Sequence, residues 1–213
     1  GFGIVNKKGA FYVPYDLLHQ SLNFQLFLSD ENIKKNVHDV KMMRVCLMND
    51  LYDIKGVTFD LLLAAYILNP NNTKEDFRVI VSNFDYTDVS YLEEVYGKGA
   101  KYKIPEEEKY QVYAVKKAIA IMDLKAELLK ELKEKNQLKL LNEMELPLAS
   151  ILAKMEFDGI NVDRAKLATL NKEVSDKIET LTTEIYDLAG TTFNVSSPKQ
   201  LGEILFDKLQ LPF

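Results

Sequence analysis

One apolar stripe near the C-terminus sets the strongest limit on how this chain can fold. Between residues 167 and 188 the apolar residues recur at steps of three or four, which places them on one face of an α-helix. Asp163 can cap the start of this helix, and Gly190 is a suitable residue just past its end. The stripe consists of Leu167, Leu170, Val174, Ile178, Leu181, Ile185 and Leu188.

A helix of about 26 residues is roughly 39 Å long. Such a helix cannot lie hidden inside a small domain, so its apolar face needs a surface that covers it. Antiparallel packing against a neighbouring helix is the usual arrangement, and binding of a partner is the alternative. The sequence therefore predicts a C-terminal segment that is dominated by one long helix.

The N-terminal third has a different pattern, in which short strands and helices alternate as in an α/β domain. Residues 2–5 and 11–13 are β-type runs joined by turn residues, which predicts a β-hairpin. Asp60 is placed to cap an apolar helix, and the chain is expected to be mostly helical beyond Pro105, with a kink or restart at Pro147. Helices are expected over residues 16–28, 40–47 and 61–68, and extended segments over 33–37 and 56–59.

Composition excludes several classes of protein. The chain has 213 residues, 27 Lys and Arg against 32 Asp and Glu, and a net charge of −5, so its overall charge gives no sign of nucleic-acid binding. One cysteine, Cys46, excludes an internal disulfide, and we expect it to be a buried helix residue. Residues 96–101 hold two glycines. They lack the spacing of a phosphate-binding loop, and we expect an exposed loop there.

Several sequence blocks together resemble bacterial DNA polymerase I of polymerase family A. Blocks in the C-terminal third resemble the start of the polymerase region, and two upstream blocks resemble the 3′–5′ exonuclease-type domain that precedes it. The similar blocks are residues 56–68, 95–101, 145–148, 155–163, 185–190, 193–201 and 205–209.

This resemblance implies an RNase H-like, α/β exonuclease-type domain over residues 1–138 and the start of the α-helical thumb over residues 139–213. It also implies that the chain is a fragment. The palm and fingers would follow Phe213, and the strand with the first metal-binding carboxylates would precede Gly1.

The resemblance also predicts that the exonuclease-type domain is inactive. In proofreading relatives, carboxylates hold two metal ions. A gapless alignment places Met43 where one of these aspartates stands, and a thioether is a poor ligand for Mg²⁺. Tyr113 matches the tyrosine of a second motif, but Lys117 replaces the aspartate of that motif, and its ammonium would repel a metal ion. Asp39, Asp60 and Asp123 are the carboxylates that could substitute. We interpret Asp60 as a helix cap and Asp123 as part of a solvated face.

Residues 194–200 are the candidate DNA-binding segment. Ser197, Pro198 and Gln200 suit the start of a helix, with a capping box between Ser197 and Gln200. In the family this loop at the thumb tip contacts the DNA backbone, which implies phosphate contacts from Asn194, Ser196 and Ser197. Lys199 is added for its charge. Residues 136–213 carry a net charge of −4 (8 Lys and Arg against 12 Asp and Glu), so we expect weak DNA binding without the palm.

The resemblance completes the functional hypothesis. It implies a part in DNA replication and repair, a primer–template duplex as partner, and a monomeric, cytoplasmic, nucleoid-associated bacterial protein without membrane contact. No metal or cofactor is expected in this chain, while Mg²⁺ is expected in the palm of the parent nucleotidyltransferase. Two alternatives stay open: an active, metal-dependent 3′–5′ exonuclease fragment, and a helical interaction module without enzymatic activity.

Overall fold

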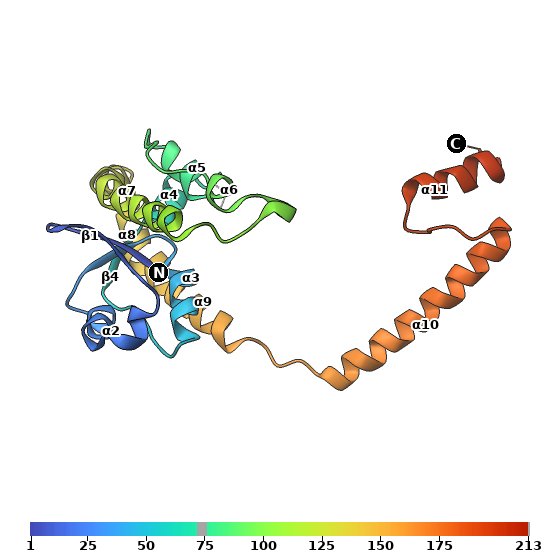
Figure 1. The fold of residues 1–213 in the computed structure, drawn as a ribbon, viewed down its shortest axis with the longest axis horizontal. Coiled ribbons are helices and arrows are strands. Elements are labelled where there is room, and N and C mark those ends of the chain that lie inside the picture. The colour runs from blue at the N-terminus through green and yellow to red at the C-terminus, as the bar shows by residue number, and fades with distance from the viewer. Residues whose placement is uncertain (72–75, 213) are drawn as a thin grey trace. The chain divides into compact units, whose positions relative to one another are not determined.

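A computed structural model describes residues 1–71 and 76–212, and the chain divides into two compact units (Figure 1). Unit 1 comprises Gly1–Gly159 and unit 2 comprises Ile160–Phe213. None of the helices in the described ranges is long and apolar enough to cross a membrane. Each unit is described by itself.

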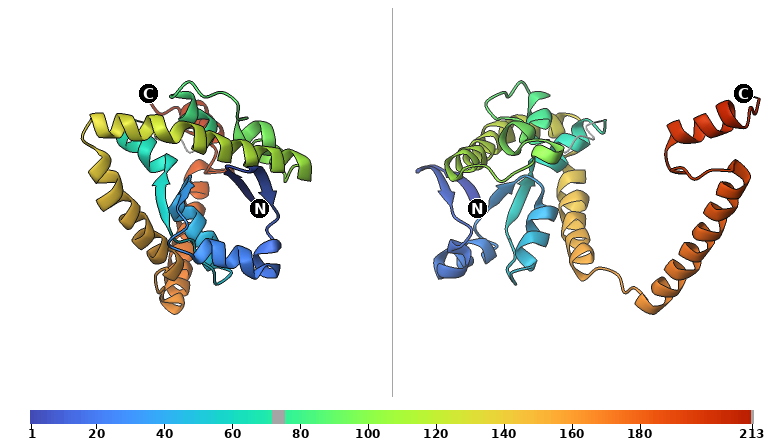
Figure 2. Two further views of the ribbon diagram at one scale, coloured as in Figure 1. Left: turned by 90° about the vertical axis from the view of Figure 1, so that its left-hand side faces the viewer. Right: turned by 45° about the vertical axis from the view of Figure 1, so that its right-hand side comes forward.

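Unit 1 begins with the predicted hairpin. Strand β1 (Phe2–Asn6) pairs antiparallel with β2 (Gly9–Val13). The hairpin lies against helix α7 (Glu107–Glu134), and both views of Figure 2 show this helix crossing it. A Cβ atom on Gly3 would lie 2.0 Å from the carbonyl oxygen of Ala114. Only glycine therefore allows β1 to approach the α7 backbone so closely.

The second sheet is a small parallel βαβ unit. Strand β3 (Lys35–Val37) pairs with β4 (Val57–Asp60), and α3 (Val40–Met48) connects them, as parallel strands require. Helix α4 (Leu61–Leu68) follows β4 directly, and the Asp60 side chain caps it as predicted. Helices α5 (Phe77–Ser82) and α6 (Leu92–Tyr96) complete this part of the unit.

Two local predictions were wrong, and a third was incomplete. The helix expected over residues 16–28 is two helices, α1 (Leu17–Gln20) and α2 (Leu22–Ser29), because Ser21 adopts an extended conformation and caps α2. Cys46 is exposed, since Leu47 rather than Cys46 takes the buried position on α3. The loop expected over residues 96–101 contains the short 3₁₀ helix η1 (Gly99–Lys101).

The end of unit 1 is an interrupted helical run. Helix α8 (Leu138–Leu140) passes into the π-helix η2 (Leu141–Glu145) and then into α9 (Leu146–Asp158), whose first turn holds Pro147 as predicted. Helix α9 packs against α3, where Lys41 pairs with Glu156. Residues 139–159 thus belong to the first compact unit. The predicted functional boundary at residue 138 stays a prediction.

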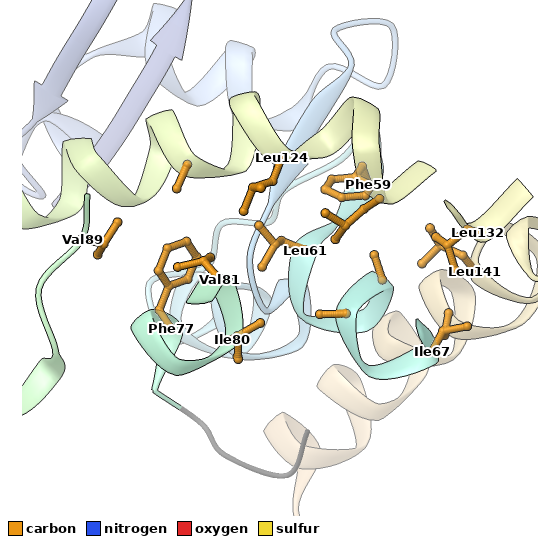
Figure 3. Packing of buried hydrophobic residues seen from close by; sticks show 14 of the residues in the cluster. Phe59, Leu61, Ile67, Phe77, Ile80, Val81, Val89, Leu124, Leu132 and Leu141 are labelled. Carbon is orange, nitrogen blue, oxygen red and sulfur yellow. The ribbon is translucent and has the colours of Figure 1, made fainter. Parts of the chain in front are cut away.

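Two hydrophobic clusters hold unit 1 together. The larger one joins β4, α4, α5 and α7, and Figure 3 shows Phe59, Leu61, Val81 and Leu124 pointing toward one another. The smaller one joins α1, α2, α3 and part of α9, and includes Leu18, Phe24 and Leu47. This α/β arrangement with a long helix agrees with the predicted fold class.

Unit 2 consists of the predicted long helix and a short helical end. Helix α10 (Arg164–Ala189) is capped by the Asp163 side chain, which accepts from Lys166 N, and it ends at Gly190 with φ 63°. Helix α11 (Pro198–Gly202) and the π-helix η3 (Glu203–Lys208) follow. The stripe of α10 is not buried: Leu170 is 52% exposed and Ile178 is 59% exposed. Among residues 160–212, no neighbouring helix of the predicted kind covers the stripe.

Candidate functional site: a partly buried lysine and a polar loop

The predicted exonuclease positions Tyr113 and Lys117 lie one turn apart on α7 and point to the same place. The Lys117 Nζ atom is 5.6 Å from the centre of the Tyr113 ring and 4.8 Å from the centre of the Phe77 ring. Both distances allow a cation–π interaction. The amino group therefore lies close to two aromatic rings, one from α7 and one from the start of α5.

Burial and nearby charges act on Lys117 in opposite directions. Burial lowers its pKa, while the carboxylates of Asp76 and Asp39 raise it. Burial, with smaller contributions from Asp76 and Tyr96, raises the pKa of Tyr113 to about 12, so this phenol stays protonated near neutral pH. The net effect is that the pKa of Lys117 is lowered, with burial as the largest cause, while its neighbour Tyr113 is a neutral phenol.

His38 completes this cluster. Its ring contacts the Phe77 ring edge-on, with 4.8 Å between centroids, and its Nε2 atom is buried without a hydrogen-bond partner among the described residues. Burial, and to a lesser extent the charge of Lys117, lowers the pKa of His38 to about 3. His38 is therefore a neutral side chain near neutral pH. We call His38, Phe77, Tyr113 and Lys117 the lysine cluster.

Asp60 has a structural role next to this cluster. Its carboxylate is fully buried and accepts the backbone N–H groups of Asp39 (3.1 Å), Val40 (2.6 Å), Leu62 (2.9 Å) and Leu63 (3.4 Å). Burial raises its pKa to about 6, although these hydrogen bonds act against the rise. Both oxygens of Asp60 are engaged by the backbone, as expected for a cap.

The other two candidate carboxylates are also accounted for. Asp39 has φ 58°, and its side chain caps α3 by accepting from Met42 N at 3.0 Å. Asp123 is exposed and accepts from the Tyr86 hydroxyl at 3.4 Å. Neither side chain shares a metal-binding group with Asp60. In residues 1–71 and 76–212, no group of three or more His, Cys, Asp or Glu could hold a metal ion.

Met43, the third predicted exonuclease position, lies apart from the lysine cluster. It is on α3, and its partly buried side chain packs against the smaller hydrophobic cluster. Tyr113 belongs to the larger cluster. A thioether in one core and an ammonium between two rings do not fit Mg²⁺, which prefers oxygen ligands in octahedral geometry.

The predicted DNA-binding loop in unit 2 is shaped by its own hydrogen bonds. The Asn194 side chain accepts from Ser196 N at 3.0 Å, and Ser197 Oγ accepts from Gln200 N at 3.4 Å. The capping-box prediction was half right: Gln200 Oε1 accepts from Asn194 N at 2.8 Å, while Ser197 N donates to the carbonyl oxygen of Asn194 at 2.9 Å. Asn194 and Ser196 are exposed.

Aromatic packing fixes where this loop leaves α10. The Tyr186 hydroxyl donates to the carbonyl oxygen of Phe193 at 2.8 Å, and the two rings contact edge-on. Lys208 donates to the carbonyl oxygen of Gly190 at 3.2 Å. Lys199 lies in the first turn of α11 with an exposed side chain. The structure therefore gathers Asn194, Ser196, Ser197 and Lys199 in one short segment.

Sequence reasoning missed His38 and Phe77 as members of the lysine cluster. His38 stands beside Asp39, but nothing in its sequence neighbourhood indicates a contact with α5. Phe77 follows Asp76, the side chain that caps α5. Its position near Lys117 depends on the packing of α5 against α7, which a single sequence does not reveal.

Two protein-family models match this chain. A family model described as the DNA polymerase I, ribonuclease H-like domain matches residues 1–124, and one described as DNA polymerase family A matches residues 164–213. The first match covers more than half of the chain. The chain therefore belongs to the DNA polymerase I family, and the predicted RNase H-like fold is confirmed.

The curated relatives that match this chain are named DNA polymerase I. The chain is 41% identical over 212 residues to DNA polymerase I of Bacillus subtilis (strain 168) and 42% identical over 212 residues to that of Geobacillus stearothermophilus. Each match covers 100% of this chain and 24% of the relative. The chain thus spans about a quarter of the length of these curated relatives.

A solved structure is similar as well. It is described as the POL domain of Pol1 from M. smegmatis in complex with DNA primer-template and dNTP. It is 28% identical with a TM-score of 0.75, and the match covers 99% of this chain and 34% of that chain.

Proposed function

We propose that this chain is part of a DNA polymerase I that acts in DNA replication and repair. In this proposal the RNase H-like part lacks proofreading activity and serves as a scaffold. The segment over residues 139–213 contributes to the thumb, which grips the primer–template duplex. The protein would be a cytoplasmic, nucleoid-associated monomer, and Mg²⁺ would act in the palm rather than on residues of this chain.

The observation that carries the inactive-scaffold part is the lysine cluster. A hydrolytic two-metal site needs several carboxylates that converge on one spot. Here Lys117 places an amino group beside the rings of Phe77 and Tyr113, where a metal ion would need a carboxylate oxygen. Two of the candidate carboxylates serve as helix caps: Asp60 accepts four backbone N–H groups, and Asp39 accepts from Met42 N.

The thumb part is supported by the exposed polar loop at residues 194–199. Hydroxyl, amide and ammonium groups are the side chains that bind phosphate oxygens. The solved relative from M. smegmatis is described in complex with a primer-template. We infer that Asn194, Ser196, Ser197 and Lys199 contact the DNA backbone, and that they read no base sequence.

A nuclease assay tests the first part. The chain is incubated with 5′-labelled single-stranded DNA, or with a primer-template and dNTPs, in Mg²⁺ or Mn²⁺. We expect neither shortened nor extended products, with a proofreading family A polymerase as positive control. Metal-dependent shortening above a chelated control would overturn the scaffold proposal in favour of an active exonuclease.

The thumb part is tested in a polymerase that includes the palm and fingers. Replacing Asn194, Ser196 and Ser197 by Ala should weaken primer-template binding by about 1–3 kcal/mol, since a neutral hydrogen bond contributes ~0.5–1.5 kcal/mol. The matched control replaces three exposed hydroxyls of α10, Thr169, Thr180 and Thr183, by Ala. Equal affinity of the two triple variants would contradict the proposed contact.

A further inference from the structure

The loop between α6 and α7 is a feature of unit 1 that the proposed function does not use. Its residues 96–103 include three lysines and no carboxylate, although the whole chain has a net charge of −5. In Figure 1 this loop projects from unit 1 between the two helices. We call residues 96–103 the basic loop. Positive charge is thus concentrated locally in a chain that is acidic overall.

The backbone of the basic loop closes on itself. Lys103 N donates to the carbonyl oxygen of Tyr96 at 2.8 Å. Gly97 has φ 80°, and a Cβ atom there would lie 2.3 Å from the carbonyl oxygen of Lys101. Only glycine therefore allows the two sides of the loop to approach so closely. The closure gives the loop a defined shape.

Two tyrosines stack on each other across this closure. The ring centres of Tyr96 and Tyr102 are 5.9 Å apart, and the ring planes are inclined by 12°. The Tyr96 ring also contacts the buried Tyr113 ring edge-on, so the core fixes Tyr96 and Tyr96 fixes Tyr102. Tyr102 is nevertheless 61% exposed. The ring face that points away from Tyr96 is therefore open to solvent.

Two lysines flank this open ring in the sequence. Lys101 and Lys103 are exposed, and neither has an ion pair or a side-chain hydrogen bond within residues 1–71 and 76–212. Lys98 differs, because it pairs with Glu93 at 2.7 Å. Two ammonium groups next to Tyr102 are thus available for anionic oxygen atoms.

Nearby carboxylates limit how large the bound anion can be. Residues 106–108 are three exposed glutamates at the start of α7, and they would repel a polyanion that extends beyond the loop. On α6, Glu94 is engaged locally, since its side chain accepts from Tyr91 N at 3.0 Å. Charge complementarity is therefore confined to the basic loop and suits a contact of a few anionic groups.

An open aromatic face between two ammonium groups suits a single-stranded nucleic acid. Bases of any kind stack on aromatic side chains, while ammonium groups bind the phosphates of the backbone. A duplex satisfies the lysines but not the ring, because its bases are already stacked on one another. An acidic peptide likewise gains little from the ring face.

We propose that the basic loop binds a short stretch of single-stranded nucleic acid, with one base stacked on Tyr102 and neighbouring phosphates on Lys101 and Lys103. This contact lies on unit 1 and does not depend on the thumb contact proposed above. It gives the RNase H-like part a binding role that needs no catalysis. Base sequence should not matter, because neither the stack nor the phosphate contacts read base edges.

Fluorescence anisotropy of labelled oligo(dT), titrated with the whole chain, tests the proposal. We expect saturable binding whose logarithm falls with the logarithm of salt concentration at a slope of about −1.4, since each phosphate contact on a single strand contributes about −0.7. The duplex of oligo(dT) with oligo(dA) should bind more weakly. Absence of saturable binding, or equally tight binding of the duplex, would overturn the proposal.

Tyrosine variants test the stacked base. Tyr102→Ala should weaken oligo(dT) binding about 5- to 150-fold, the range for one lost base stack, while Tyr102→Phe should keep the affinity because it keeps the ring. The matched control is Tyr66→Ala, which removes a 48% exposed tyrosine from α4. Thermal unfolding is measured in parallel. Equal affinities of Tyr102→Ala and Tyr66→Ala would overturn the stacking contact.

Lysine variants test the phosphate contacts. Lys101→Gln combined with Lys103→Gln should reduce the salt slope by about 1.4, because two phosphate contacts are lost. The matched control combines Lys7→Gln and Lys8→Gln, which removes two exposed lysines from the turn between β1 and β2 and should leave the slope unchanged. The same slope in both double variants would contradict the assignment.

A last variant separates this contact from the thumb. Replacing Asn194, Ser196 and Ser197 by Ala should leave oligo(dT) binding unchanged. Loss of binding in that triple variant, with Tyr102→Ala unaffected, would assign the binding to the thumb loop and overturn the proposal.

Discussion

The two compact units bury their apolar residues to very different extents. In unit 1, large side chains such as Phe59 and Leu128 are 0% exposed, and two clusters connect sheets and helices. Among residues 160–212, Ala189 alone is buried, whereas Ile178 in the stripe of α10 is 59% exposed. Unit 1 is therefore held by its own core, while α10 depends on local helix stability and end caps.

The same contrast applies to the predicted functional residues. In unit 1, Lys117 packs beside two aromatic rings, and Met43 packs against a hydrophobic cluster. In unit 2, Asn194 and Ser196 remain at the surface. Side chains that pack into a core contribute to stability, and side chains left exposed in a shaped loop are available for a ligand. The comparison predicts which substitutions change folding.

The largest expected effect on stability comes from a comparison of two aspartates that cap helices, Asp60 and Asp163. Asp60→Ala removes the acceptor of four backbone N–H groups in the core and should lower the free energy of unfolding by about 3–5 kcal/mol. Asp163→Ala removes the exposed cap of α10 and should cost about 1 kcal/mol. Urea denaturation followed by circular dichroism measures both. Similar losses would show that burial of Asp60 adds nothing.

The next largest effect on stability is expected when apolar side chains are shortened in the two units. Leu128→Ala in the larger cluster should lower the free energy of unfolding by about 2–5 kcal/mol because it leaves a cavity. Ile178→Ala on the exposed stripe should change it by less than about 0.5 kcal/mol. A large loss for Ile178→Ala, measured in the same way, would mean that the stripe is covered in solution.

The lowered pKa of His38 should make the stability of the folded protein depend on pH. Its pKa is lowered from 6.5 to about 3 in the folded protein, so the unfolded chain binds the proton first, and stability is lost as pH falls from 6.5 toward 3. Asp60, with its pKa raised from 3.8 to about 6, acts the other way, because the folded state takes up its proton first.

His38→Phe removes the loss of stability that protonation of His38 causes, and it keeps an aromatic ring beside Phe77. Between pH 6.5 and 5 the variant should therefore lose less stability than the unchanged chain, by up to about 2 kcal/mol at pH 5. The control is His19→Phe, since His19 is exposed. Parallel stability curves for His38→Phe and the unchanged chain would contradict a His38 side chain that stays neutral in the folded protein.

Much of the fold could be predicted from sequence because its signals are local. Turn residues at Lys7 and Lys8, the caps Asp60 and Asp163, and the spacing on α10 each act over a few residues. Ser21 ended a helix that the apolar pattern would continue, since its side chain caps the following helix.

The candidate sites were only partly predictable, because their members meet through tertiary packing. Tyr113 and Lys117 could be paired from their spacing on one helix. Phe77 and His38 reach Lys117 from other elements. The stack of Tyr102 on Tyr96 likewise needs the closure of the basic loop, and no periodicity in the sequence indicates that contact.

The smallest expected effects are those of single serine substitutions in the thumb loop. They distinguish a serine that caps a helix from one that contacts DNA. Ser197 Oγ accepts from Gln200 N at 3.4 Å, a long hydrogen bond, so Ser197→Ala should cost about 0.5–1 kcal/mol of stability. The exposed Ser196 caps no helix, so Ser196→Ala should leave thermal unfolding unchanged. If both hydroxyls contact phosphates, both variants should weaken primer-template binding in the polymerase by about two- to tenfold. A loss for Ser197→Ala alone would reduce the loop to a helix cap, whereas equal losses would show that the exposed hydroxyl contributes to binding without contributing to the fold.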